Sequence, residues 1–171
     1  MLDIRIAQTQ DAPIIALLAR LTFSETFGDL FADKNDLRVY LDQTFGVAKI
    51  KQGLSKPNNC FAIAYFNDLP VGYGKLKYSS PSDFVELPAL GQLQKLYVLQ
   101  AFLSQKIGLQ LQNFLFAEAQ AKEVKSIWLS VLDTNLRAIR FYQKSGFQEL
   151  GKFQFQIGKE LFDFTAMLKS L

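Results

Sequence analysis

The sequence predicts an α+β fold built on a mixed, largely antiparallel sheet. Apolar residues recur at helical spacing through much of the first 54 residues, and the pattern changes to strand-like runs after residue 60. The second half alternates strands and helices and ends in two strands. Because apolar periodicity is the primary signal of secondary structure, the predicted order is strand, helices, three strands, helix, strand, helix, two strands.

The N-terminal third begins with an alternating strand over residues 2–7. Thr9 or Asp11 can cap the helix that follows, Pro13 suits its first turn, and Gly28 ends it. Two shorter helices are expected over residues 33–44 and 47–54. The apolar stripe expected to bury the first helix contains Ile14, Leu17, Leu18, Leu21, Phe23 and Phe27.

The remaining elements follow from strand patterns, turn residues and one further amphipathic helix. Asn67–Pro70 is a hairpin turn, and Gly146 is expected to close the last helix in a left-handed conformation. The expected strands are 60–66, 71–78, 89–99, 126–131, 147–155 and 161–168, and the expected helices are 107–122 and 135–144.

Length and composition exclude several classes of protein. The 171 residues are the size of one domain, spanning 1–171, and the 49% hydrophobic and 20% charged fractions are those of a globular protein. Lys and Arg are dispersed, with a net charge of +3, so no nucleic-acid partner is expected. The sequence has no apolar run of about 18 residues and no signal-peptide pattern, so we expect a cytoplasmic protein with no membrane association.

The absence of histidine limits the chemistry. Neither a Ser-His-Asp nor a Cys-His system can be built, and one cysteine, Cys60, forms no internal disulfide and is expected in the core. No metal site is expected, because the commonest zinc ligand is missing. Catalysis must therefore rely on carboxylate, tyrosine, lysine, backbone amides or water.

Two segments have patterns that suit cofactor chemistry. Leu96–Leu99 form an apolar strand that leads through a turn into a helix at about Lys106–Gly108, and a helix N-terminus can hold phosphate. Taken alone, this pattern favours an ordinary strand–helix connection. In the second segment Asn135 begins a helix and Tyr142 lies about two turns later, so both can point to the same side. Asn135 is also a routine N-cap, and Tyr142 can equally be a core residue.

Together these segments resemble the GNAT superfamily of N-acetyltransferases, and the element order matches that fold from Ile4 to Leu168. The resemblance implies a seven-stranded GNAT-like sheet flanked by helices, with acetyl-CoA as cosubstrate. It implies that Tyr142 is the acid that protonates the departing thiolate. The cofactor-binding residues that it implies are Tyr97, Val98, Leu99, Leu103, Ser104, Gln105, Lys106, Ile107, Gly108, Asn135 and Lys144.

The chain departs from the family pattern at two places. The family's pyrophosphate loop has the pattern Gln/Arg-x-x-Gly-x-Gly/Ala. When it is aligned without a gap, Leu103 stands at the Gln/Arg position, Lys106 stands at the first Gly, and only Gly108 fits. A register shifted to begin at Gln105 fits Gln105 and Gly108 but fails at Gln110; we prefer the gap-free one, because backbone amides do the binding. In many relatives a glutamate lies just before the Leu-Tyr-Val stretch, where this chain has Gln94, which cannot accept a proton at neutral pH.

The N-terminal half is similar to the bacterial spermidine/spermine N-acetyltransferases, through residues 21–28, 36–41 and 72–76. The resemblance therefore implies direct acetyl transfer to a small primary amine, with a polyamine such as spermidine as one acceptor, and suggests a homodimer. Glu25 is the first candidate for the catalytic base, ahead of Asp29 and Glu86, and a strand N–H near Leu99 is the expected donor to the thioester oxygen. Three alternatives stay open: an acyl-CoA sensor without activity, acetylation of a protein or amino-acid amine, and a structural α+β domain.

Overall fold

The structure, a computed structural model, describes residues 1–171 and contains one seven-stranded sheet in the order β1-β2-β3-β4-β5-β7-β6. Every neighbouring pair is antiparallel except β4 and β5, which are parallel. This confirms the predicted mixed, largely antiparallel sheet. The strands are β1 (Leu2–Ile6), β2 (Asn59–Phe66), β3 (Leu69–Lys77), β4 (Leu90–Val98), β5 (Ser126–Leu132), β6 (Gln148–Ile157) and β7 (Glu160–Ser170).

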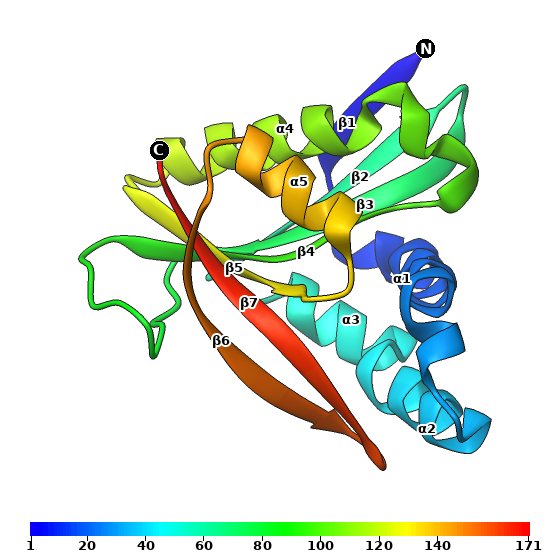
Figure 1. The fold of residues 1–171 in the computed structure, drawn as a ribbon. Helices are drawn as coiled ribbons and strands as arrows, with labels where there is room; N and C mark the ends of the chain where they lie inside the picture. Colours follow the sequence, from blue (N-terminus) through cyan, green and yellow to red (C-terminus); the bar gives the residue numbers. More distant parts are fainter.

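Helices cover both faces of the sheet (Figure 1). One core lies between the sheet and α1–α3 and includes side chains from the β6–β7 hairpin; the other lies under α4 and α5. None of the helices is both long and apolar enough to cross a membrane. The α-helices are α1 (Ala12–Phe27), α2 (Lys34–Thr44), α3 (Val47–Leu54), α4 (Ile107–Ala121) and α5 (Leu136–Lys144), and the short 3₁₀ helices are η1 (Thr9–Asp11), η2 (Gly28–Leu30) and η3 (Gln100–Gln105).

Local sequence signals account for most element ends. Asn67 and Asp68 both have positive φ, as a tight hairpin turn between right-handed twisted strands requires. Asp33 caps α2 through a hydrogen bond from the Asn35 N–H, and Gly146, with φ of +90°, follows α5 as predicted. Gly28 ends α1 but remains in a right-handed conformation, because the chain continues directly into η2.

The start and the buried face of α1 differ from the prediction. Asp11 occupies the N-cap position, but its carboxylate accepts hydrogen bonds from Arg5 and the Gln8 N–H rather than from the helix. Leu17 and Leu21 face solvent, with exposed fractions of 59% and 46%. The buried face of α1 combines small and large residues, which lets the helix approach the sheet closely. Its members are Ala12, Ile15, Ala16, Leu18, Ala19, Thr22, Phe23 and Phe27.

Glycine permits the closest backbone approach beside the end of β4. A Cβ on Gly72 would lie 2.8 Å from the Tyr97 carbonyl oxygen and 3.1 Å from Val98 Cγ2. Because the nearer atom belongs to the backbone of a paired strand, β3 and β4 would have to separate to admit a methyl group. Gly72 therefore fixes the position of the last residues of β4.

Gly72→Ala is expected to lower the free energy of unfolding by about 1–3 kcal/mol through overpacking, as measured by urea denaturation. Gly28→Ala is the matched control, since φ at Gly28 is −55° and the nearest atom to an added Cβ is 3.9 Å away. The control should retain wild-type stability or exceed it. Equal stability of the two variants would contradict this role of Gly72.

Candidate active site

The central feature of the site is a divergence of β4 from β5 in the middle of the sheet. These strands pair only at Leu90–Gln92 with Ser126–Trp128; beyond that, β4 follows β3 to Val98 and β5 follows β7 to Leu132. The register jumps from Lys75 opposite Lys95 to Leu76 opposite Leu93, which leaves Gln94 as an extra residue. A bulge bends its strand, which accounts for the divergence. The result is two facing strand edges whose backbone groups are free to bind an extended ligand.

Strand alternation determines which backbone groups face this opening. The Leu99 N–H donates to the Val71 carbonyl oxygen at 2.8 Å, so it points toward β3. The expected donor to the thioester oxygen, a strand N–H near Leu99, is therefore not the N–H of Leu99 itself, because that group is already used. Since successive N–H groups of a strand point to opposite edges, the Val98 N–H faces the opening.

The N-terminus of α4 lies immediately beyond the end of β4. The structure confirms the predicted helix start, with Lys106 in a left-handed conformation (φ 58°) between η3 and Ile107. Gln110 is the donor of the first backbone bond into the helix, to the Lys106 carbonyl, so the N–H groups of residues 107–109 have no partner in the helix. A Cβ on Gly108 would meet only Val98 Cγ2, at 3.9 Å. Neither its φ nor its packing requires this glycine, and its missing side chain leaves the helix end open to a ligand.

The segment predicted as an open turn between β4 and α4 is the 3₁₀ helix η3. Leu103, Ser104 and Gln105 lie in it, and a 3₁₀ helix satisfies N–H groups through its own i→i+3 bonds. The sequence offered no proline or capping side chain to signal this element. The free amide donors are therefore concentrated at residues 107–109, at the C-terminal end of the predicted loop.

Tyr142 approaches the opening from α5. Its ring makes edge contacts with Phe141 and Phe147, at centroid distances of 5.2 and 5.6 Å, and it is half-buried. Burial raises the pKa of the Tyr142 hydroxyl, so the phenol remains protonated at neutral pH. Burial also raises the pKa of Tyr97 on β4, with a further contribution from the nearby Tyr142 phenol. Tyr142 on α5 is therefore close enough to Tyr97 on β4 to influence the pKa of its hydroxyl.

Asn135 and Lys144 lie at opposite ends of α5. The Asn135 side-chain oxygen accepts a hydrogen bond from the Ala138 N–H at 3.1 Å, which confirms the N-cap reading, while its amide nitrogen donates to no protein group. Lys144 is exposed in the last turn. It borders a hollow of about 330 Å³ between α4 and α5, lined by Leu109, Gln112, Asn113, Phe116, Phe141, Lys144, Ser145 and Lys169.

Gln112 is a polar residue of this hollow that the sequence did not single out. It is 2% exposed, its amide nitrogen donates to Ser145 Oγ, and its Oε1 has no hydrogen-bond partner. A buried polar position on the apolar face of α4 was the available signal. A larger hollow, of about 610 Å³, lies at the outer β1–β2 edge and contains none of the predicted site residues: Met1, Asp3, Arg5, Tyr65, Asn67 and Asp68.

The three carboxylates considered as bases lie in different surroundings. Glu25 is exposed on α1, and its carboxylate accepts a hydrogen bond of 3.0 Å from the Gln100 N–H, which fastens the end of β4 to α1. Asp29 is exposed in η2. Glu86 precedes β4, at the opposite end of that strand from Tyr97–Leu99. Only Glu25 is connected to the site by a hydrogen bond.

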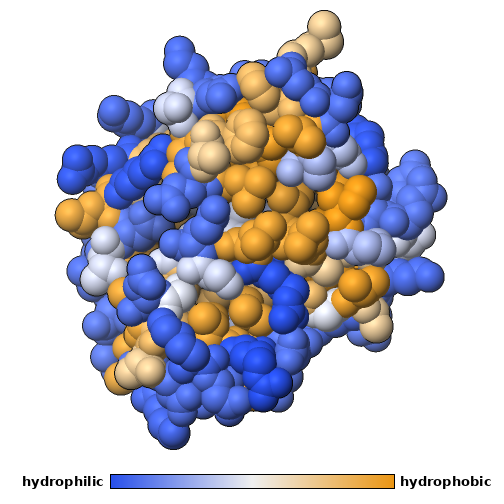
Figure 2. Space-filling view, turned by 90° about the vertical axis from the view of Figure 1, so that its right-hand side faces the viewer, coloured by the Kyte–Doolittle hydropathy of each residue, from blue (hydrophilic) through white to orange (hydrophobic).

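The opening is directed toward the side of the molecule that carries η3, α1 and the start of α4 (Figure 1). Figure 2 faces this side and shows a broad hydrophobic area across the upper half of the surface, bordered by hydrophilic residues. Leu17 and Leu21 of α1 and Leu136 of α5 are among the exposed apolar residues of the chain. Apolar surface of this extent is typical of a ligand- or partner-binding face. No group of three or more carboxylate and thiol side chains lies close enough together to hold a metal ion.

Comparison with solved structures confirms the fold. The chain is similar over its full length to the PaiA N-acetyltransferase of Thermoplasma acidophilum, solved in complex with coenzyme A, with a TM-score of 0.78, 18% identity and 99% of that chain covered. It is also similar to the ribosomal-protein-S18-alanine N-acetyltransferase of Escherichia coli, with a TM-score of 0.73, 16% identity, and 99% of this chain and 94% of that chain covered.

Sequence relatives agree with this fold. An uncharacterized N-acetyltransferase from Lactobacillus delbrueckii subsp. lactis is 27% identical over 94% of this chain and 93% of its own length. Another, from Mycobacterium bovis, is 27% identical over 86% of this chain and 90% of its own length. The model of the acetyltransferase (GNAT) family matches residues 20–147, which is most of the chain. This protein therefore belongs to the GNAT family of acetyltransferases, and it is an acyltransferase enzyme.

Proposed function

We propose that residues 1–171 form one N-acetyltransferase domain that moves the acetyl group of acetyl-CoA directly to the primary amine of a small molecule. The observation that carries this proposal is the opening between β4 and β5, with free amides of α4 on one side and the Tyr142 phenol on the other. An extended acyl-thioester fits between two unpaired strand edges, and a diphosphate fits a helix N-terminus.

Each part of acetyl-CoA has a counterpart in the site. The β4 edge at Tyr97–Leu99 receives the pantetheine arm, with Val98 supplying the backbone groups that face the opening. The diphosphate lies at the residues 103–108 predicted from sequence, where the free N–H groups begin at Ile107 and Lys106 adds a positive charge. Asn135 offers its amide N–H groups. Lys144 and Gln112, on the hollow between α4 and α5, suit the nucleotide end.

The chemistry requires loss of a proton from the amine and gain of one by the thiolate. A primary ammonium has a pKa of about 10.4, so deprotonation at pH 7 costs roughly 4–5 kcal/mol. Because Gln94 cannot accept this proton, we propose that water or Glu25 accepts it. The neutral amine attacks the thioester carbonyl, whose oxygen is stabilised by the Val98 N–H. As the carbon–sulfur bond breaks, Tyr142 donates its proton to the departing thiolate, and the proton that the new amide nitrogen loses returns to the phenolate through water.

The N-terminal resemblance suggests a polyamine as the acceptor, and a polyamine requires negative charge at its binding site. Spermidine carries several positive charges and would need carboxylates at its binding site. Glu25 is the one carboxylate that is hydrogen-bonded to the site, and it is already paired with a backbone N–H. We therefore do not propose spermidine as the acceptor, but it should be included among the amines that are tested as substrates.

Tyr142→Phe is expected to lower kcat about 10²–10⁴-fold, because the general acid is removed while the ring and its packing stay. The measurement is thiol release from acetyl-CoA with an acceptor that the wild type uses. Tyr65→Phe, at the far β1–β2 edge, is the control and should retain wild-type kcat. An acyl-CoA sensor would bind acetyl-CoA and release no thiol with any amine.

Gly108→Ala is expected to weaken acetyl-CoA binding about ten-fold or more without loss of fold stability. The added methyl group has room within the protein, since its nearest neighbour is 3.9 Å away, but it lies on the helix turn proposed to receive the diphosphate. Isothermal calorimetry gives the Kd, and Gly28→Ala is the matched control. Unchanged affinity in Gly108→Ala would place the diphosphate elsewhere.

A further inference from the structure

Two lysines lie directly opposite each other on β3 and β4, at the bulge where the opening begins. Lys75 and Lys95 are cross-strand partners in the register, on the face of the sheet that is covered by α1–α3. The Lys75 ammonium lies 5.3 Å from the centroid of the Phe61 ring, and the Lys95 ammonium lies 5.5 Å from that of Phe45. Aromatic faces attract cations, so these rings hold both ammonium groups on this side of the sheet.

Neither lysine has an acidic partner. The four ion pairs of the molecule are Arg5–Asp11, Arg20–Asp42, Lys152–Asp133 and Lys159–Asp33. The charged groups that act on Lys75 are all positive: Lys77, Lys95, Lys56 and Lys49. Like charges directly opposite each other destabilise a sheet, and the fold compensates this cost with aromatic contacts but with no carboxylate.

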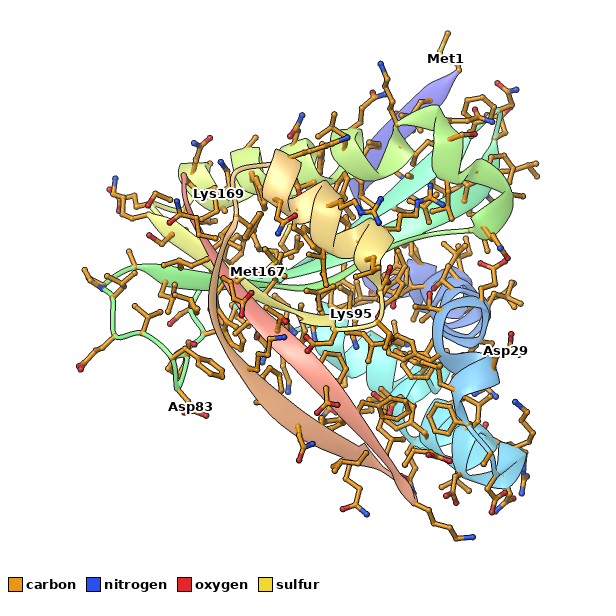
Figure 3. The ribbon with its side chains drawn as sticks, in the orientation of Figure 1. Met1, Asp29, Asp83, Lys95, Met167 and Lys169 are labelled. Atoms are coloured by element: carbon orange, nitrogen blue, oxygen red, sulfur yellow. The ribbon has the colours of Figure 1, made fainter.

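Neither ammonium group is completely sealed from solvent. Lys75 and Lys95 are half-buried, and the only fully buried side-chain polar atom without a partner is Gln112 Oε1. The two lysine nitrogens therefore keep contact with solvent. In Figure 3 Lys95 lies in the middle of the molecule, well separated from Asp29 on one side and Asp83 on the other.

The pair is close to the proposed reaction centre. Lys95 precedes Tyr97 by two residues on the same face of β4, which corresponds to about 7 Å along a strand. The Tyr142 phenol in turn contributes to the raised pKa of Tyr97. Because Lys95 is only two residues from Tyr97 on β4, we expect an anionic group carried near the acceptor amine to lie on the side of the lysine pair.

We propose that the acceptor amine also carries a carboxylate, and that Lys75 and Lys95 bind this carboxylate from β3 and β4. The inference rests on the proposed acetyltransferase function and specifies its substrate class as a carboxylate-bearing primary amine. It disfavours a polyamine, because a polycation placed beside two unpaired ammonium groups is repelled.

The electrostatics of the free protein agree with such a site. Burial lowers the pKa of Lys95 to about 8, and burial together with the neighbouring lysines lowers that of Lys75 to about 8. A bound carboxylate favours the charged form of both lysines and offsets the free-energy cost of burying the two ammonium groups. Residues that destabilise the free protein and strengthen ligand binding are typical of functional sites.

The test compares matched acceptors in an assay of thiol release from acetyl-CoA. The panel contains free amino acids, the corresponding amino acid amides and spermidine. Each amide has the same side chain and lacks the carboxylate, and its amine is the less basic of the two, which favours the amide at pH 7. We expect the free acid to be preferred by about ten-fold or more in kcat/KM, because the bonds to its carboxylate are charge-assisted.

Lys75→Met and Lys95→Met remove the charge and keep an unbranched side chain that is one atom shorter. Each is expected to raise KM for the preferred acid about ten-fold or more, with the Kd for acetyl-CoA unchanged and the preference over the amide lost. Lys122→Met, at the exposed end of α4, is the matched control and should retain the wild-type preference.

Thermal unfolding gives a readout independent of activity. The pKa of Lys95 is about 8 in the folded chain against an ordinary value of 10.5, so the unfolded chain binds more protons between these values. The wild type therefore gains stability as pH rises from 8 to 10.5, while below pH 8 the unfavourable burial of charge is fully present. Lys95→Met should have a Tm a few degrees above wild type at pH 7, and this difference should narrow by pH 10.

Two failures are distinguishable. If thiol is released with spermidine or with the amides as efficiently as with any free acid, or if the lysine variants keep the wild-type KM, the carboxylate proposal is wrong and acetyl transfer stands. If no amine in the panel releases thiol while acetyl-CoA binds, the proposed acetyltransferase function fails, and the substrate class fails with it.

Discussion

The extra residue at Gln94 is the constraint on which the rest of the site depends. A bulge there bends β4 away from β5 after only three paired residues, which opens the sheet at its centre. The sheet can remain open because each half is paired on its other side, β4 with β3 and β5 with β7. Helices α1–α3 and α4–α5 then close the two faces over independent cores. The opening is therefore held by two separately stabilised halves.

The two faces of the opening differ in chemical character. The α4–α5 face offers hydrogen-bond donors and isolated positive charge, in the helix N-terminus, Asn135 and Lys144, as an anionic nucleotide requires. The α1–α3 face offers aromatic rings and the paired lysines. The proposed reaction takes place where these faces meet, at the opening beyond the last paired residues of β4 and β5. This arrangement separates the cosubstrate from the acceptor and brings their reactive groups together.

Several residues are energetically unfavourable in the isolated chain. Gln112 has a buried oxygen without a donor, Lys75 and Lys95 face each other, and Leu17 and Leu21 expose apolar surface. A bound ligand or partner would stabilise each of these groups: a hydrogen-bond donor for Gln112, an anion for the lysine pair and an apolar surface for the leucines. Gln112 lines the hollow between α4 and α5, and the lysine pair lies at the bulge where the opening begins, so these two costs fall at the proposed binding surfaces.

The sequence by itself determined the elements and the family. Asn67-Asp68 specifies a tight turn, Asn135 and Gly146 delimit α5, and apolar periodicity predicted α3 and the start of α4 at the correct residues, because caps, turns and amphipathic faces are local properties. Non-local contacts were decided only by the tertiary structure. The bulge at Gln94, the pairing of Lys75 with Lys95, the use of the Leu99 N–H by Val71 and the tie between Glu25 and Gln100 all depend on strand register and helix placement. Register is set by the packing of the whole sheet, so no window of sequence contains it.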